Sequence, residues 1–167
     1  MGYTTYFDGQ IELDKPLTDE LYDFLIKFSN TRRMKRDVNK LKEMGYDGDY
    51  GVEGEFFVDG DGAFGQRFDD SIIDINQPPH TQPGLWCQWI PTDDRMAIAW
   101  DGGEKFYHAD EWMKYLVERI LAPKGYVANG EIFATGEDSD DLWKIKVVDN
   151  QVNVYGGRVI YEDEAGY

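Results

Sequence analysis

Cysteine is almost absent from this sequence of 167 residues, in which Cys87 is the single example. One cysteine excludes an internal disulfide framework and a zinc site built from several thiolates. Long hydrophobic runs are also missing, since the apolar runs are only a few residues long and a membrane span needs ~18. Residues 1–8 contain neither a basic region nor an apolar stretch. We therefore expect no secretory signal, a cytoplasmic location and no membrane partner.

The composition predicts one folded domain. Apolar residues make up 41% of the chain and aromatic residues 15%, which is too rich for an intrinsically disordered protein. The length is typical of a single domain with its own core. We expect this domain to cover residues 1–161, followed by an acidic, frayed tail over residues 162–167.

Positive charge is scarce and unevenly placed. The chain has 33 acidic and 17 basic side chains, for a net charge of −16. This excess repels nucleic-acid phosphates and anionic membranes, so we expect no direct binding to nucleic acid. Residues 31–42, however, contain six basic residues and one acid. That segment carries +5 and leaves −21 for the rest of the chain.

Hydrophobic periodicity predicts eight strands and two helices. Apolar residues recur with helical spacing from Leu21 to Phe28, after a potential N-cap at Thr18, and again between His108 and Leu121. Strands are predicted at residues 3–13, 52–58, 71–75, 85–90, 96–100, 126–135, 142–148 and 152–160. The order lacks the regular alternation of parallel α/β folds. We therefore predict an α+β fold, a mostly antiparallel sheet of about six to eight strands with two helices packed on one face.

The sequence contains partial matches to motifs of known chemistry, but the residues around each match do not fit the motif. Residues 60–65 match G-x-G-x-x-G, but no helix follows to hold a pyrophosphate. Neither acidic loop, starting at Asp47 or at Asp59, has the glycine and glutamate that an EF-hand requires. In a strand Cys87 shares a face with Leu85 and Trp89, which favours a buried thiol over a nucleophile. Adjacent acids are common in a chain of this charge and are usually solvated, so we assign no acid–base catalysis to them. We predict no catalytic residue, cofactor or metal, and the sequence leaves open whether the acidic loops bind calcium.

Aromatic and polar residues gather in residues 78–89 and 100–107, which hold three of the five tryptophans. One interpretation is a concave binding surface; the other is a sheet core with a structured loop. The candidate contact residues are Trp86, Gln88, Trp100, Glu104, Lys105 and Tyr107.

The basic segment provides four further candidates: Arg32, Arg33, Lys35 and Arg36. These side chains either pair with carboxylates of their own chain or hold a phosphate or an acidic partner by charge-assisted hydrogen bonds. Few aromatics are interleaved with them, so the segment is weak evidence for nucleic-acid binding. The sequence leaves its direction, inward or outward, open.

Several blocks resemble a family of small acidic proteins of phages and bacterial genomes with no assigned function. They include Thr31–Asp37, Gln82–Trp89 and Trp100–Tyr107, and the likeness continues through Glu111–Leu116 and Gly125–Asp138. The resemblance implies a phage or mobile-element context and supplies no catalytic residues.

Two functional hypotheses follow. The first is a non-enzymatic interaction protein that binds a host or phage protein with a basic surface, as DNA-mimic inhibitors do, and modulates a host nucleic-acid-handling or defence protein. The alternative is a binding module for a nucleotide or other phosphorylated small molecule, in which the 32–36 segment meets phosphates and Trp86 or Trp100 stacks on a base. An enzyme ranks third.

Overall fold

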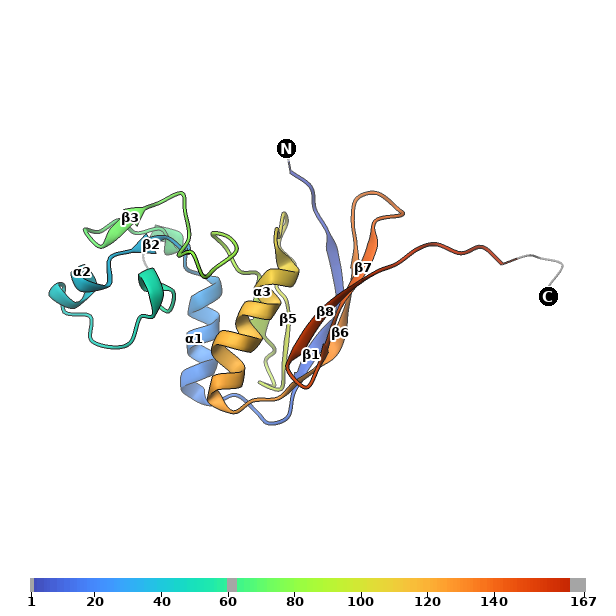
Figure 1. Ribbon diagram of the computed structural model, residues 1–167, viewed down its shortest axis with the longest axis horizontal. Helices are drawn as coiled ribbons and strands as arrows, with labels where there is room; N and C mark the ends of the chain where they lie inside the picture. Colours follow the sequence, from blue (N-terminus) through green and yellow to red (C-terminus); the bar gives the residue numbers. More distant parts are fainter. Residues whose placement is uncertain (1, 60–62, 163–167) are drawn as a thin grey trace.

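A six-stranded antiparallel sheet forms the body of the protein (Figure 1). The computed structural model describes residues 2–59 and 63–162. The strands lie in the order β4-β5-β1-β6-β7-β8. Their bounds are β1 Tyr6–Leu13, β4 Trp89–Pro91, β5 Ala97–Trp100, β6 Ala128–Thr135, β7 Leu142–Val148 and β8 Gln151–Gly156. Two residues with positive φ, Asp149 and Asn150, make the tight turn between β7 and β8.

Two helical segments pack on one face of this sheet. Helix α1 (Asp19–Ser29) starts at the predicted cap, where Thr18 Oγ1 accepts a hydrogen bond from the Leu21 N–H at 3.2 Å. Helix α3 (Ala109–Tyr115) continues through one π-helical segment, η3 (Leu116–Leu121), into a 3₁₀ turn, η4 (Ala122–Lys124). Both segments bury their apolar side in the core of the sheet.

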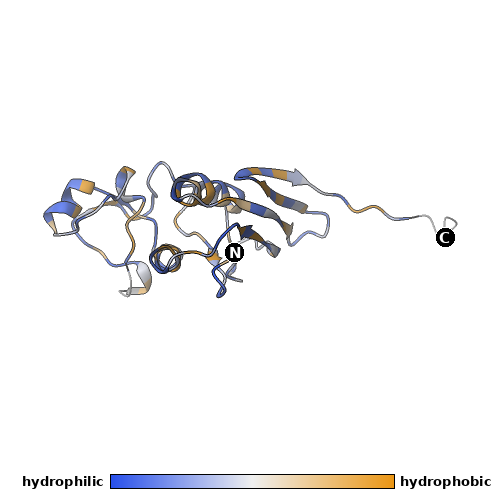
Figure 2. Cartoon of the chain, turned by 90° about the horizontal axis from the view of Figure 1, so that it is seen from below, coloured by the Kyte–Doolittle hydropathy of each residue, from blue (hydrophilic) through white to orange (hydrophobic). Residues whose placement is uncertain are grey.

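Alternation along the strands separates the two faces of the sheet. On β1 the side chains of Phe7, Ile11 and Leu13 are buried, whereas those between them are exposed. The same banding of hydrophobic and hydrophilic positions is visible along the strands in Figure 2. Trp89 and Trp112, both almost fully buried, complete the core with the helices.

The remaining residues between α1 and β4, residues 31–88, form a side lobe next to α1 (Figure 1). It contains β2 (Lys35–Arg36), α2 (Val38–Glu43), η1 (Val52–Gly54), η2 (Ala63–Gly65) and β3 (Ile72–Asp74). Strands β2 and β3 form a separate antiparallel pair. Met34, Leu41 and Phe57 are buried within the lobe and lie outside the main core. Most of the lobe is irregular chain.

The structure confirms the mostly antiparallel α+β architecture. Its helices differ from the predicted pair, because α2 is present in the side lobe and α3 continues into the π-helical segment η3. The strand predicted at residues 52–58 is wrong: Gly51, Glu53 and Gly54 have positive φ and turn the chain through η1. The last strand ends at Gly156 instead of residue 160. Part of the glycine motif, residues 60–62, and the tail residues 163–167 lie outside the described residues. In the described part of the chain, no helix is long and apolar enough to cross a membrane.

Candidate functional site

Two of the four candidate side chains of the basic segment point into the protein. Arg33 and Arg36 are each 2% exposed. Arg36 Nη1 donates to Asp69 Oδ2 at 2.9 Å and to Ser71 Oγ at 2.8 Å, and its guanidinium lies 4.0 Å from the centre of the Phe57 ring. All of these contacts of Arg36 are with groups of its own lobe.

Arg33 lies at the junction between the lobe and α1. Its guanidinium is 4.2 Å from the centre of the Phe28 ring, and Nη2 donates to the Glu55 carbonyl oxygen at 2.9 Å. Burial lowers the pKa of Arg33 to about 10. This burial corrects the prediction that Arg33 and Arg36 contact a ligand or a partner, because neither guanidinium is accessible.

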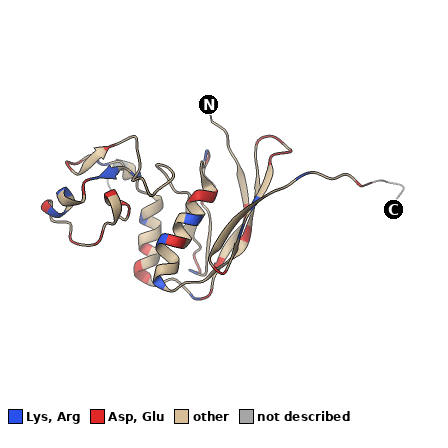
Figure 3. Cartoon of the chain, viewed as in Figure 1, with Lys and Arg blue, Asp and Glu red and all other residues tan. Residues whose placement is uncertain are grey.

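Arg32 and Lys35 are half-buried and also bonded within the lobe. Arg32 Nε donates to the Ile75 carbonyl at 2.9 Å, and Lys35 Nζ lies 3.3 Å from Glu53 Oε2. The four cations thus collect carbonyl and carboxylate oxygens of loops that have few ladder hydrogen bonds of their own. Through these contacts the basic segment holds the lobe together. Figure 3 shows basic and acidic positions side by side along the chain of the lobe.

A buried carboxylate, Glu55, joins this lobe to α3 and η3. One carboxylate oxygen accepts from Tyr115 Oη at 2.8 Å, Thr81 Oγ1 at 3.2 Å and Arg119 Nε at 3.2 Å. The other accepts from Arg119 Nη2 at 2.5 Å and from the Val52 N–H at 2.7 Å. Sequence analysis did not select Glu55, because nothing local distinguishes it from the other acids of the chain.

An open cavity of about 480 Å³ borders this network. Its polar walls include Thr81, Gln82, Tyr115 and Arg119, all of which already bond to Glu55. A second cavity of about 650 Å³ lies between α1, η3 and the lobe, with mainly apolar walls. In the ranges 2–59 and 63–162, no group of three or more His, Cys, Asp or Glu residues is arranged to hold a metal ion.

Cys87 is expected to be unreactive in the folded protein. The thiol is 1% exposed, and burial raises its pKa to about 12. At neutral pH, a thiol reagent should modify it about 100-fold more slowly than in the chain unfolded by urea. Labelling followed by mass spectrometry measures both rates. Equal rates would show that the thiol is accessible in the native state.

Five of the predicted contact residues meet at one end of the sheet. Gln88 Nε2 donates to the Glu104 carbonyl at 2.9 Å, and Trp100 Nε1 donates to Gln88 Oε1 at 3.2 Å. Lys105 and Tyr107 follow in the same loop, and both are exposed. Trp86, the sixth candidate, precedes Cys87 in the sequence and is half-buried.

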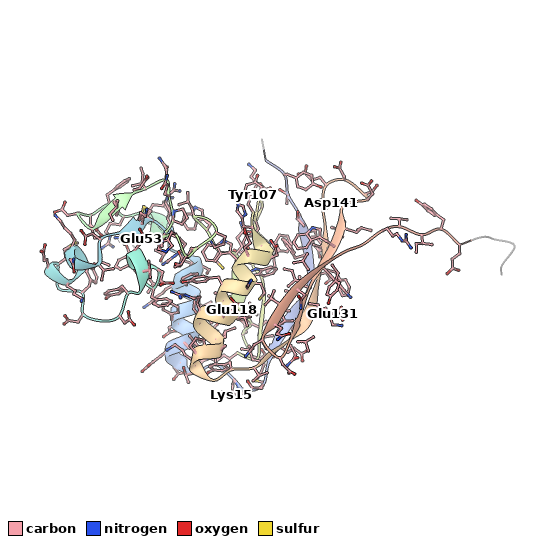
Figure 4. The ribbon with its side chains drawn as sticks, in the orientation of Figure 1. Lys15, Glu53, Tyr107, Glu118, Glu131 and Asp141 are labelled. Carbon is pink, nitrogen blue, oxygen red and sulfur yellow. The ribbon has the colours of Figure 1, made fainter. Side chains whose placement is uncertain are left out.

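Tyr3 connects this loop to the acidic loop between β6 and β7. The Tyr3 N–H donates to Tyr107 Oη at 3.2 Å, and Tyr3 Oη donates to Asp141 Oδ2 at 2.6 Å. Thr4 N–H donates to Glu137 Oε1 at 2.9 Å. Figure 4 shows Tyr107 and Asp141 on either side of the N-terminal segment. Sequence analysis missed Tyr3 and residues 137–141 as parts of this site, because the contacts span more than 100 residues.

We call residues 2–6, 101–107 and 137–141 the acidic end. The two loops contain six carboxylates, on Asp101, Glu104, Glu137, Asp138, Asp140 and Asp141, against one lysine. Tyr3, Tyr6 and Tyr107 are exposed by 36%, 62% and 51%. The Asp141 carboxylate, as acceptor, raises the pKa of Tyr3, and burial raises the pKa of Asp101. The acidic end is therefore a surface that combines strong negative charge with exposed tyrosines.

Comparisons with protein-family models, with curated proteins and with solved structures find no match to this chain. The candidate function therefore depends on the geometry of the acidic end.

Proposed function

We propose that this chain is a non-enzymatic interaction protein whose acidic end binds a host or phage protein with a basic surface. The observation that carries the proposal is the pairing of six carboxylates with three exposed tyrosines across loops that Tyr3 holds together. Tyrosine is enriched at the centres of protein interfaces, and complementary charge accelerates association.

The rest of the charge distribution supports this assignment. Arg33 and Arg36 are buried, and Arg32 and Lys35 are bonded within the side lobe. These four cations therefore do not form a free surface patch that offsets the negative field of the exposed loops. The exposed basic residues of the segment are Lys40 and Lys42. The same burial argues against the nucleotide-binding alternative, because a phosphate would need accessible guanidinium groups.

The biological setting belongs to the same proposal. A phage or mobile-element protein of net charge −16 has the electrostatics to occupy the basic surface of a nucleic-acid-handling or defence protein of its host. Occupying that surface would exclude the nucleic acid and inhibit the partner.

Neutralising the acidic end should weaken the binding of a basic partner by about tenfold or more at low ionic strength. The test variant combines Glu104→Gln, Asp138→Asn and Asp140→Asn, all at exposed side chains. Wild-type and variant chains are immobilised, and proteins retained from a host lysate are identified and then titrated in purified form. A basic protein that binds the wild type in a salt-sensitive manner and the variant weakly supports the proposal.

The matched control combines Glu20→Gln, Asp23→Asn and Asp93→Asn, which are exposed side chains elsewhere on the body. Both triple variants change the net charge from −16 to −13. Equal loss of affinity in the two variants would contradict a specific role for the acidic end and indicate a general charge effect.

A further inference from the structure

Among the residues that the structure describes, no strand pairs with the outer edge of β8, and the chain continues from this strand as an extended arm. Figure 1 shows residues 157–162 leaving the body beyond β8. The arm contains three consecutive apolar residues, Val159, Ile160 and Tyr161, which are 48%, 70% and 90% exposed. Apolar side chains exposed in sequence on an extended arm are typical of a segment that a protein surface covers.

The β8 edge lacks the charged residues, prolines and β-bulges that prevent strands of separate molecules from pairing. Residues 151–156 contain no charged side chain and no proline, and the pairing of β8 with β7 runs in continuous register. Over residues 151–161 the only charged group is Arg158, in a chain of net charge −16. A second copy of the chain therefore meets little acid–acid repulsion at this edge.

The register of β8 determines which arm residues would face the core. Val152 and Val154 pair with Val147 and Ile145, which are buried, so even-numbered residues of β8 face the helices. The Gly157 N–H still donates to the Leu142 carbonyl at 2.7 Å, so the strand geometry continues into the arm. Arg158 and Ile160 have the same parity as Val152 and belong to the core-facing side. Arg158 follows Val154, which is 48% exposed, so its charged end can stay in water while Ile160 is covered.

We propose that two copies of the chain pair through residues 151–161 as antiparallel strands about a two-fold axis near Gly156. Antiparallel pairing of identical strands is self-complementary, which suits a two-fold dimer. In this register Ile160 of one copy lies opposite Val152 of the other, on the helix-covered face. The two six-stranded sheets become one continuous sheet, and the exposed arms become covered. This association does not depend on the acidic end.

Sedimentation velocity across a range of protein concentrations tests the dimer. The wild-type chain should sediment with twice the mass of one chain. Ile160→Asp should weaken the dimer by about tenfold or more, because its carboxylate would be buried against Val152 without a partner. Removal of residues 158–167 should abolish the dimer. High salt should leave the wild-type dimer intact, in contrast to binding at the acidic end.

Phe133→Asp serves as the matched control, because Phe133 is 52% exposed on β6, in the interior of the sheet order. It should dimerise as the wild type does. Thermal unfolding verifies that each variant is folded. A wild-type chain that stays monomeric at its highest soluble concentration overturns the proposal. So does a dimer that both Ile160→Asp and the truncation leave unchanged.

Discussion

Replacing Glu55 with alanine is expected to lower the free energy of unfolding by about 3 kcal/mol or more, because a fully buried carboxylate with five donors is removed. The Tyr115 hydroxyl, on a side chain that is 5% exposed, would then lack its acceptor in the protein interior. Arg119 is 44% exposed and regains water, which limits the loss. Urea unfolding followed by tryptophan fluorescence measures the change.

Two further variants serve as controls for Glu55→Ala. Glu55→Gln keeps the shape and loses the charge, so it should be destabilised less than Glu55→Ala. Glu118→Ala removes an exposed acid beside the same cavity and should change stability by less than about 0.5 kcal/mol. A Glu55→Ala protein as stable as Glu118→Ala would show that the buried network contributes little.

The same carboxylate predicts a loss of stability in acid. Burial alone would raise the pKa of Glu55, but hydrogen bonds from Val52, Arg119 and Tyr115 together lower it below its usual range. A group whose pKa is lower in the folded state stabilises the fold above its unfolded pKa of about 4.3. This contribution declines as the pH falls through the folded pKa. The wild type should therefore lose more stability than Glu55→Gln below about pH 4.3.

Replacing Arg33 with methionine is expected to lower the free energy of unfolding by about 2–4 kcal/mol. Methionine retains apolar contact with Phe28, but the Glu55 carbonyl loses one of its two donors and keeps only Gln82 Nε2. The buried Gln82 Oε1 also loses its contact with Arg33 Nε. Arg32→Met is the control, because Arg32 is half-buried at the edge of the lobe. Arg32→Met should lower the free energy of unfolding by less than about 1 kcal/mol.

Equal stability changes at the two arginines, measured by urea unfolding, would contradict the inward role assigned to Arg33. Binding measurements add an independent readout. If Arg33 acts only through the fold, a folded Arg33→Met protein binds its partner with wild-type affinity.

Sequence reasoning succeeded where local signals act within one element. Thr18 and the Leu21–Phe28 spacing predicted α1, and alternation predicted most strands of the main sheet. In the side lobe it predicted β3 within residues 71–75 and failed at residues 52–58, which have the aromatic composition of a strand but contain positive-φ positions that impose a turn. Side-chain hydrogen bonds from the basic segment determine this region, and such contacts leave no periodic pattern.

The candidate site was predictable only where its residues are close together in the sequence. Gln88, Trp100, Glu104, Lys105 and Tyr107 lie within 20 residues of one another, and their composition identified them as a group. The 137–141 loop joins them through Tyr3 and Thr4 of the N-terminal segment, over a sequence separation of 138 residues between Tyr3 and Asp141. The charge of Arg33 and Arg36 was visible in the sequence, but their burial depends on oxygen atoms from distant loops.

The most direct test of the central claim is hydrogen–deuterium exchange of the chain with and without its purified basic partner. We predict slower exchange on binding in residues 2–6, 101–107 and 137–141, and unchanged exchange in residues 31–42. Protection confined to the basic segment, with the acidic end exchanging as in the free chain, would contradict the claim that the acidic end is the binding surface.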